Sequence, residues 1–271
     1  MNDHSPPGTT LIDIGANLTN KRFQMDLPDV LARAQQAGID HLLVTGTNLD
    51  ESVSAADLSA RYPQQLSSTA GVHPHHAVEF EHSHYALLKE LAARPQVKAI
   101  GECGLDFNRM FSPEEKQVAA FEQQLELAIE LGLPLFLHER DAHQKQWEML
   151  ASVRDQLAGG VIHCFTGTRE QAFRYLDLDL YLGITGWICD ERRGQHLHEF
   201  VADIPLDRLL LETDAPYLTP RVKPAPALAV KGRNEPFTLP LVLAEITRHH
   251  RVSSATIAAA TTTNARRLFG L

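Results

Sequence analysis

The chain has 271 residues, of which 44% are hydrophobic, and it carries a formal net charge of −9 at pH 7. This length suits one large domain or two small ones, and no window reaches the roughly 20 apolar residues that a membrane-spanning helix requires. The negative charge is the wrong sign for a protein that coats long nucleic acids, because such proteins neutralise many phosphates with lysine and arginine.

The N-terminal segment and the cysteines indicate where the protein works. Residues 1–10 are polar and lack both the basic and the apolar part of a signal peptide. We expect a disordered lead-in at residues 1–10, followed by a single domain at 11–271. The cysteines are widely spaced and form no CxxC pair, which argues against a disulfide framework and favours a reducing cytoplasm. They are Cys103, Cys164 and Cys189.

Short apolar, β-branched runs alternate along the chain with longer segments of helical period. Most of these runs are nearly continuous, as in LLVTG and LLLETD, which is typical of parallel strands buried on both faces. Eight runs are predicted as strands: residues 11–17, 41–46, 67–73, 97–106, 133–140, 160–167, 180–186 and 209–215.

The clearest predicted helix follows the fourth strand. Ser112 is placed as its N-cap, Pro113 as its first residue, and Glu115 completes a capping box. Gly132 is well placed to end it. Similar but weaker patterns lie at 28–37, 51–61, 84–94, 142–157, 169–176, 191–201 and 239–249, and a last helix at 254–268 is capped by Ser253 or Ser254.

Eight strand–helix units without a linker predict a (β/α)8 barrel, a fold that takes about 250 residues. A doubly wound open sheet is the main alternative. The number of units and the absence of a glycine-rich phosphate motif after the first strand count against it. The longest irregular stretch, residues 217–236, follows the eighth strand, where we expect a lid or substrate wall.

Ionisable side chains stand where five of the predicted strands end. A lone histidine at such a place is more often a hydrogen-bonded core residue. The joint pattern instead indicates a divalent-metal site, because (β/α)8 active sites are built at the carboxyl ends of the strands. Imidazoles and a carboxylate suit Zn²⁺, Mn²⁺ or similar ions. The residues are His73, Glu102, Asp106, His138, His163, Glu212 and Asp214.

Several motifs, taken in order, resemble the TatD family of metal-dependent deoxyribonucleases over about residues 12–271. They read GTNL, AGVHPH, IGECGLDF, HCFTG, GITGW, ETDAPYL and RNEP. The resemblance implies a metal at Glu102, His138 and His163, with Asp214 as the acid/base or a further ligand. It also implies hydrolysis of DNA, often as a 3′-to-5′ exonuclease.

The first strand departs from the pattern of most of this family. Most members begin with His-x-His, which holds one metal of a two-metal site, whereas this chain has Gly15 and Asn17 at those positions. Glycine has no ligating side chain and asparagine offers only a weak neutral oxygen. We therefore expect one metal site to be weakened or lost. The subgroup represented by TatD itself looks similar in this respect, so the departure favours that branch.

We hypothesise a division of roles at this end of the barrel. Glu102, with His138 and His163, holds the ion, and Asp214 accepts the proton of the attacking water. His73 contacts the scissile phosphate or protonates the leaving oxygen.

Further residues are candidates for holding the substrate. Asn17 and His75 are expected to orient it. Arg140 contacts a phosphate or, equally well, pairs with Asp106 or Asp141. Other basic or aromatic candidates are Arg192, Arg193, Arg233 and Asn234 for flanking phosphates, and Trp187 and Tyr217 for base stacking, with loop packing as their slightly favoured alternative.

These residues predict a metal-dependent nuclease that cuts DNA, with RNA as a further candidate, as a 3′-to-5′ exonuclease on single-stranded ends in DNA degradation or repair. Mg²⁺ or Mn²⁺ is expected for activity, and Zn²⁺ is a further candidate for the site. An enzyme that binds only the end of a nucleic acid strand needs few phosphate contacts, which fits the net negative charge of this protein. One alternative is a metal-dependent esterase that deacylates aminoacyl-tRNA. Another is a degenerate metal-binding scaffold. We expect a cytoplasmic monomer with a nucleic acid substrate and no membrane association.

Overall fold

Eight parallel strands form the centre of the computed structural model, which describes residues 10–271. They are hydrogen-bonded in chain order, and a parallel bridge between Ala16 and Ala215 joins the two ends of the sheet. The sheet therefore closes on itself, and the predicted (β/α)8 barrel is confirmed. The strands are β1 (Leu11–Ala16), β2 (Ile39–Val44), β3 (Leu66–Ala70), β4 (Val97–Asp106), β5 (Leu135–Arg140), β6 (Gly160–Ile162), β7 (Tyr181–Ile184) and β8 (Leu209–Leu211).

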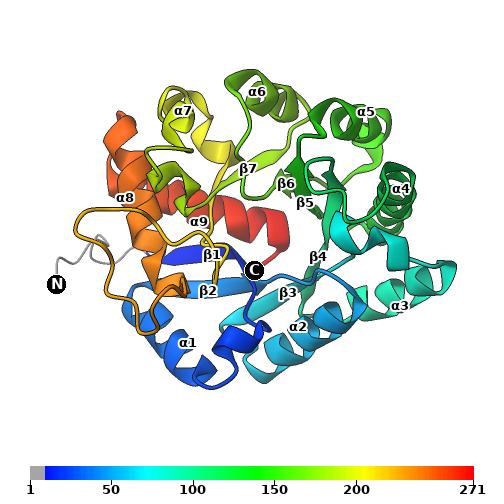
Figure 1. Cartoon of the computed structure of the whole chain (residues 1–271), viewed down its shortest axis with the longest axis horizontal. Helices are drawn as coiled ribbons and strands as arrows, with labels where there is room; N and C mark the ends of the chain where they lie inside the picture. Colours follow the sequence, from blue (N-terminus) through cyan, green and yellow to red (C-terminus); the bar gives the residue numbers. More distant parts are fainter. Residues whose placement is uncertain (1–9) are drawn as a thin grey trace.

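Helices surround the barrel in the same order as the strands, so that α1 to α8 form an outer ring (Figure 1). They are α1 (Leu27–Gln36), α2 (Leu49–Arg61), α3 (His82–Ala92), α4 (Glu114–Leu131), α5 (His143–Val153), α6 (Arg169–Asp177), α7 (Gln195–His198) and α8 (Leu239–His249). The lead-in expected at residues 1–10 lies outside the described residues, except for Thr10.

The last helix, α9 (Ser254–Phe269), closes one end of the barrel. Its Ala265 and Phe269 belong to the same buried cluster as Ile14 and Phe136, which point into the barrel. The Asn264 amide donates to the carbonyls of Leu206 and Leu209 where β8 begins. Because α9 covers the amino ends of the strands, the carboxyl ends remain open for a site.

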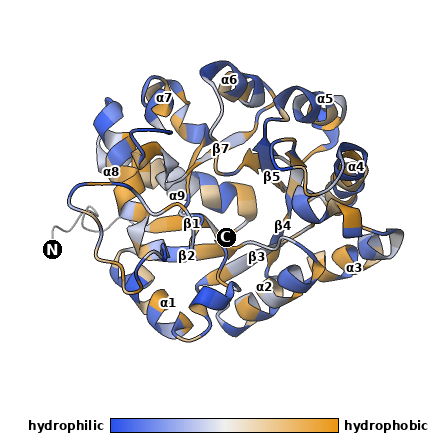
Figure 2. Cartoon of the chain, in the orientation of Figure 1, coloured by the Kyte–Doolittle hydropathy of each residue, from blue (hydrophilic) through white to orange (hydrophobic). Residues whose placement is uncertain are grey.

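Hydropathy follows this architecture, because much of the strand surface is hydrophobic while the helices of the outer ring carry both hydrophilic and hydrophobic residues (Figure 2). Apolar side chains between strands and helices form the larger core, and those inside the barrel form a smaller one. Within residues 10–271, no helix is both long enough and apolar enough to cross a membrane.

Three local predictions need correction. Ser112 does not cap α4; its hydroxyl donates to the carbonyl of His75, and the helix begins at Glu114 without a side-chain cap. The helix predicted at 191–201 is reduced to the four residues of α7. Strands β6 and β8 end early because the backbone turns into the left-handed region at Cys164 and Asp214, with φ of 44° and 52°. The cap at Ser253 is confirmed, as is the helix end at Gly132.

Candidate active site

A cavity of about 950 Å³ opens at the carboxyl end of the barrel. Segments that follow seven of the strands and the ends of β4 and β5 line it. Most side chains at its floor are histidines and carboxylates, whereas aromatic and basic side chains stand towards its rim. The predicted residues that line it are Asn17, His73, His75, Glu102, Asp106, His138, Arg140, His163, Trp187, Arg193, Asp214 and Tyr217.

Three imidazoles converge on one carboxylate oxygen at the centre of the cavity floor. Glu102 Oε1 lies 3.3 Å from His73 Nε2, 3.0 Å from His138 Nδ1 and 2.8 Å from His163 Nε2. Glu102 is only 6% exposed. Burial opposes ionisation, but the surrounding imidazoles outweigh it and hold the pKa of Glu102 well below its usual range. Glu102 is therefore a carboxylate anion surrounded by the imidazole nitrogens of three histidines.

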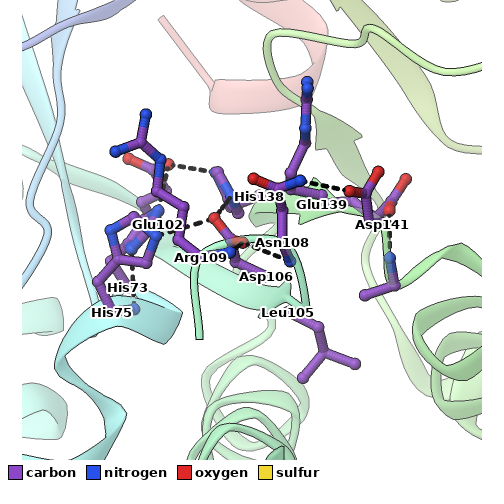
Figure 3. Close-up of polar contacts among 12 residues, drawn as sticks. His73, His75, Glu102, Leu105, Asp106, Asn108, Arg109, His138, Glu139 and Asp141 are labelled. Atoms are coloured by element: carbon purple, nitrogen blue, oxygen red, sulfur yellow. Dashed lines mark hydrogen bonds and ion pairs between the residues drawn. The ribbon is translucent and has the colours of Figure 1, made fainter. Parts of the chain in front are cut away.

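A second carboxylate, Asp106, lies beside this cluster (Figure 3). Its Oδ2 is 2.8 Å from His75 Nε2 and 3.2 Å from His138 Nε2, and its Oδ1 accepts the backbone N–H of Arg109. His138 is thus held between Glu102 and Asp106. Burial lowers the pKa of His138, but the hydrogen bonds to these two carboxylates outweigh it and raise the pKa above its ordinary value.

The hydrogen bonds of His73 determine which of its nitrogens carries the proton. Its Nδ1 accepts the backbone N–H of His75 at 3.0 Å, so in the neutral ring the proton sits on Nε2. Burial lowers the pKa of His73 to about 4. At neutral pH the residue is therefore an uncharged donor whose N–H points at Glu102.

Asp214 lies where the backbone leaves β8 in the left-handed conformation, with φ of 52°. Its Oδ1 accepts a hydrogen bond from Asn17 Nδ2 at 3.0 Å. Burial raises the pKa of Asp214 to about 7, and the charges of Glu102 and Glu212 add to this rise while His163 opposes it. A carboxyl group with such a pKa can take up and release a proton near neutrality.

The space beside Gly15 explains the altered first strand. A Cβ at this position would lie 2.5 Å from Glu212 Oε2 and 3.2 Å from Phe136 Cζ. Glu212 is fully buried, its Oε1 accepts the backbone N–H of Cys164, and its Oε2 is 3.5 Å from His163 Nδ1. The Glu212 carboxylate therefore occupies the space that a larger side chain at position 15 would need.

The donor set fits a divalent cation. Ligand atoms of His73, Glu102 and His138 lie within 4.8 Å of one another, and His163 contacts the same Glu102 oxygen. Imidazole nitrogens with a buried carboxylate are a ligand combination of Zn²⁺ and related ions. The structure brings together the predicted ligands Glu102, His138 and His163, and it adds His73. Asp214 interacts electrostatically with this group from the neighbouring wall.

Arg140 points into the cavity. Its Nη1 donates to Thr166 Oγ1 at 3.2 Å, and its guanidinium lies 5.5 Å from the centre of the Trp187 ring. Within residues 10–271 it forms no ion pair with Asp106 or Asp141, the alternative that the sequence left open. Arg193 lies on the same ring, 4.2 Å from its centre.

Arg233 and Asn234, predicted to grip phosphates, do not line the cavity. Arg233 is 2% exposed and its guanidinium donates to Asp26 and Glu235. The Asn234 amide is fully buried and donates to the carbonyl of Thr213. The expectation is corrected, because both side chains are buried outside the cavity, where their hydrogen bonds hold the loop after β8.

Arg233→Met is therefore expected to lower the free energy of unfolding by about 3 kcal/mol, because it removes a buried cation and leaves Arg33 as the remaining partner of the Asp26 and Glu235 carboxylates. The KM for an oligonucleotide should stay unchanged. Arg193→Met is the matched control, since this arginine lines the cavity and is half exposed. It should leave stability within about 0.5 kcal/mol and raise KM. Urea unfolding measures the stability of each variant, and steady-state kinetics measure its KM. A raised KM with unchanged stability in Arg233→Met would indicate that Arg233 binds the substrate.

Some residues of the site were not assigned roles from the sequence. The sequence did contain a signal for Asp106. Residues four apart in a strand lie on the same face, and Glu102, four residues before Asp106, was already a candidate. Glu212 was marked only as an ionisable residue at a strand end, since its role depends on the empty space at Gly15. Phe111 and Arg109 line the cavity from the loop after β4, where no pattern marked them.

A (β/α)8 barrel with histidines and carboxylates at the carboxyl ends of its strands defines a metal-dependent hydrolase. Residues 12–270 match the family model described as TatD related DNase. The chain belongs to the TatD family of deoxyribonucleases.

Curated relatives and solved structures agree with this assignment. A protein of Erwinia tasmaniensis named 3′-5′ ssDNA/RNA exonuclease TatD is 50% identical over 262 residues, 96% of this chain and 100% of its own. The protein of the same name in Escherichia coli K12 is 48% identical over 262 residues, 96% and 99% of the two chains. A crystal structure of a TatD homologue from Escherichia coli K12 has a TM-score of 0.85 at 29% identity and covers 96% of this chain and 98% of that chain. A TatD family hydrolase from Entamoeba histolytica has a TM-score of 0.86 at 26% identity, with the same coverage.

Proposed function

We propose that the protein is a divalent-metal-dependent 3′-to-5′ exonuclease that removes nucleotides from single-stranded DNA and RNA. The observation that carries the proposal is the convergence of His73, His138 and His163 on the buried Glu102 carboxylate, at the floor of an open cavity. The names of relatives about 50% identical over nearly the whole chain support the substrate and the direction of cleavage.

Glu102, His138 and His163 would hold the cation, with His73 beside it. When bound, such an ion neutralises charge on phosphoryl oxygens and lowers the pKa of water. We propose Mg²⁺ or Mn²⁺ as the ion that supports turnover, with Zn²⁺ as a further ion that the imidazoles would accept. Because Gly15 offers no ligand, side chains of the cavity take over tasks that a second metal would otherwise perform.

Asp214 is placed to take the proton of the attacking water, with its orientation fixed by Asn17. His73 is suited to hold a phosphoryl oxygen rather than to protonate the leaving group, because its ring is neutral and offers only an N–H. His75, beside Asp106, and Arg140, beside Trp187, are further candidates for substrate contacts.

Aromatic side chains at the rim are suited to hold bases. Phe111 is 63% exposed, Tyr217 is 50% exposed, and both line the cavity. Trp187 lines the cavity too, beneath the guanidinium groups of Arg140 and Arg193. Base stacking on aromatic rings tolerates any sequence, as an exonuclease requires.

Phe111→Ala is expected to raise the KM for a single-stranded oligonucleotide about 5- to 150-fold, because stacking contributes about 1–3 kcal/mol per base. The kcat should change much less, since the ring packs against His75 rather than against Asp214, the proposed proton acceptor. Met110→Ala is the matched control, because Met110 is also exposed and adjacent but does not line the cavity. An equal effect of both substitutions on KM would rule out a stacking role.

The proposal is tested by digesting oligonucleotides labelled at the 3′ or the 5′ end with metal-loaded protein. Stepwise loss from the 3′ end, abolished by EDTA, is the expected result. Loss from the 5′ end would reverse the proposed direction. Turnover of aminoacyl-tRNA without oligonucleotide cleavage would favour the esterase alternative, and no turnover of either would favour the scaffold.

We also propose that the enzyme works as a cytoplasmic monomer in DNA degradation or repair. The three cysteines are free, which fits a reducing compartment. Size-exclusion chromatography with light scattering tests the monomer directly.

A further inference from the structure

A second group of potential metal ligands lies on the outside of the barrel. His198 of α7 and Glu245 and His249 of α8 have ligand atoms within 4.8 Å of one another. None of the three lines the active-site cavity. We propose that they form a second metal site, for a transition-metal ion of the Zn²⁺ type, which joins α7 to α8.

The donor set is the first argument for this site. Glu245 and His249 are four residues apart on α8 and so share one face of the helix. Glu245 Oε1 lies 3.2 Å from His249 Nε2 and 3.5 Å from His198 Nε2. Two imidazoles and one carboxylate leave a fourth position open, as in many three-ligand zinc sites.

The orientation of the rings is the second argument. The His198 and His249 rings stack with centres 3.9 Å apart and planes 14° apart. Both rings thereby direct their Nε2 atoms towards the same oxygen of Glu245. One cation beside that oxygen would be bound by the Nε2 lone pairs of both rings, and each neutral ring would then carry its proton on Nδ1.

Neighbouring groups hold the Glu245 carboxylate in position to bind a metal ion. Arg248 Nη1 donates to the other oxygen, Oε2, at 2.8 Å, and so holds the Glu245 carboxylate in place with Oε1 free for the ion. His198 Nε2 lies 2.7 Å from the carbonyl oxygen of Ile188, which accepts its proton. Binding through Nε2 therefore requires the tautomer with the proton on Nδ1, and it leaves the Ile188 carbonyl beside the ion. Burial, with the charge of Glu245, raises the pKa of Cys189 to about 12, so that residue stays a thiol and is not counted as a ligand.

The position of the site predicts a structural effect. The α7 segment has four residues, too few for a helix that is stable without tertiary contacts. Ile188 belongs to the 3-10 segment η4 (Gly186–Cys189), which also carries Trp187 of the cavity wall. An ion shared by α7 and α8 would stabilise this side of the barrel without entering the chemistry.

Equilibrium dialysis of chelator-treated protein against Zn²⁺, followed by metal analysis, tests the proposal. His249→Ala and Glu245→Gln should each lose about one bound equivalent relative to wild type, and the same loss should appear in a Glu102→Ala background, where the active-site ion is weakened. His250→Ala, the adjacent histidine, and His196→Ala on α7 should lose none. Glu245→Gln keeps the shape of the side chain and serves if His249→Ala does not fold.

Thermal unfolding gives a readout that is independent of stoichiometry. Zn²⁺ at about 100 times its Kd should raise the Tm of the Glu102→Ala protein by roughly 5 °C or more through mass action. The rise should be absent when Glu245→Gln is added and present when His250→Ala is added. Equal Zn²⁺ stoichiometry and equal Tm shifts in the ligand and control variants would overturn the proposal.

Discussion

Glu102→Ala lowers kcat/KM for single-stranded oligonucleotides by at least about 10³-fold, equivalent to about 4 kcal/mol of transition-state stabilisation. The reason is that one oxygen of this carboxylate lies within 3.3 Å of His73, His138 and His163, so its removal leaves the proposed cation without its central ligand. Steady-state kinetics at saturating Mg²⁺ or Mn²⁺ measure the loss.

A matched control separates this role from a general effect of losing a cavity carboxylate. Glu51 lines the same cavity but contacts Thr19 rather than the histidines. Glu51→Ala should keep kcat/KM within about tenfold of wild type. Full activity of Glu102→Ala would point to a contaminating nuclease or to a different site, and metal binding by the purified variant would distinguish the two.

Asp214→Asn lowers kcat by about 10²- to 10⁴-fold, the range expected when a general base is lost. Asparagine keeps the size of the side chain and can still bond with Asn17, but it cannot accept a proton. The substitution should change KM little, because the contact to substrate in the ground state is preserved. A raised KM with an unchanged kcat would instead indicate that Asp214 binds the substrate.

The pH dependence of the wild-type enzyme follows from the same residue. Burial raises the pKa of Asp214 to about 7, so the carboxyl is protonated and unable to act as a base at lower pH. We expect kcat to fall as pH decreases through this pKa, with a midpoint at or below about 7 because a bound cation favours the ionised form. Measurement at saturating metal removes the contribution of metal loss, and the acid limb should be absent from Asp214→Asn.

The departure at Gly15 has a physical explanation in this structure. A side chain there would meet the Glu212 carboxylate, which is held by the backbone of Cys164 and lies beside His163. The same carboxylate therefore occupies the vacated space and supports a histidine of the remaining site. Its position indicates that this site is kept in order, as expected of a working enzyme rather than of a degenerate scaffold.

The strands and their endings were predictable because their signals are local. Buried parallel strands are continuous apolar runs, and parallel strands of one barrel end at one face. His138, His163 and Glu102 could thus be grouped from their places in the sequence, and their contacts confirm the grouping.

Side-chain direction in the loops was not predictable in the same way. Arg233 follows an irregular segment whose path is set by contacts with Asp26, 207 residues away in the chain. The helix expected at 191–201 failed for a related reason. Asp190 binds the side chains of Arg192 and Arg193 and the backbone N–H of Arg192, and these bonds stabilise a turn where the amphipathic pattern alone indicates a helix.

By itself, the sequence determined the barrel, the end of it that carries the site, and the gathering of histidines and carboxylates at that end, since each of these follows from periodicity and from the order of strands. Only the tertiary structure decided which nitrogen of His73 carries the proton, why Gly15 is tolerated and where Arg233 points. The physical reason is that these properties depend on atoms that are distant in sequence and meet only after folding. The joining of α7 to α8 through His198 and Glu245 belongs to the same category.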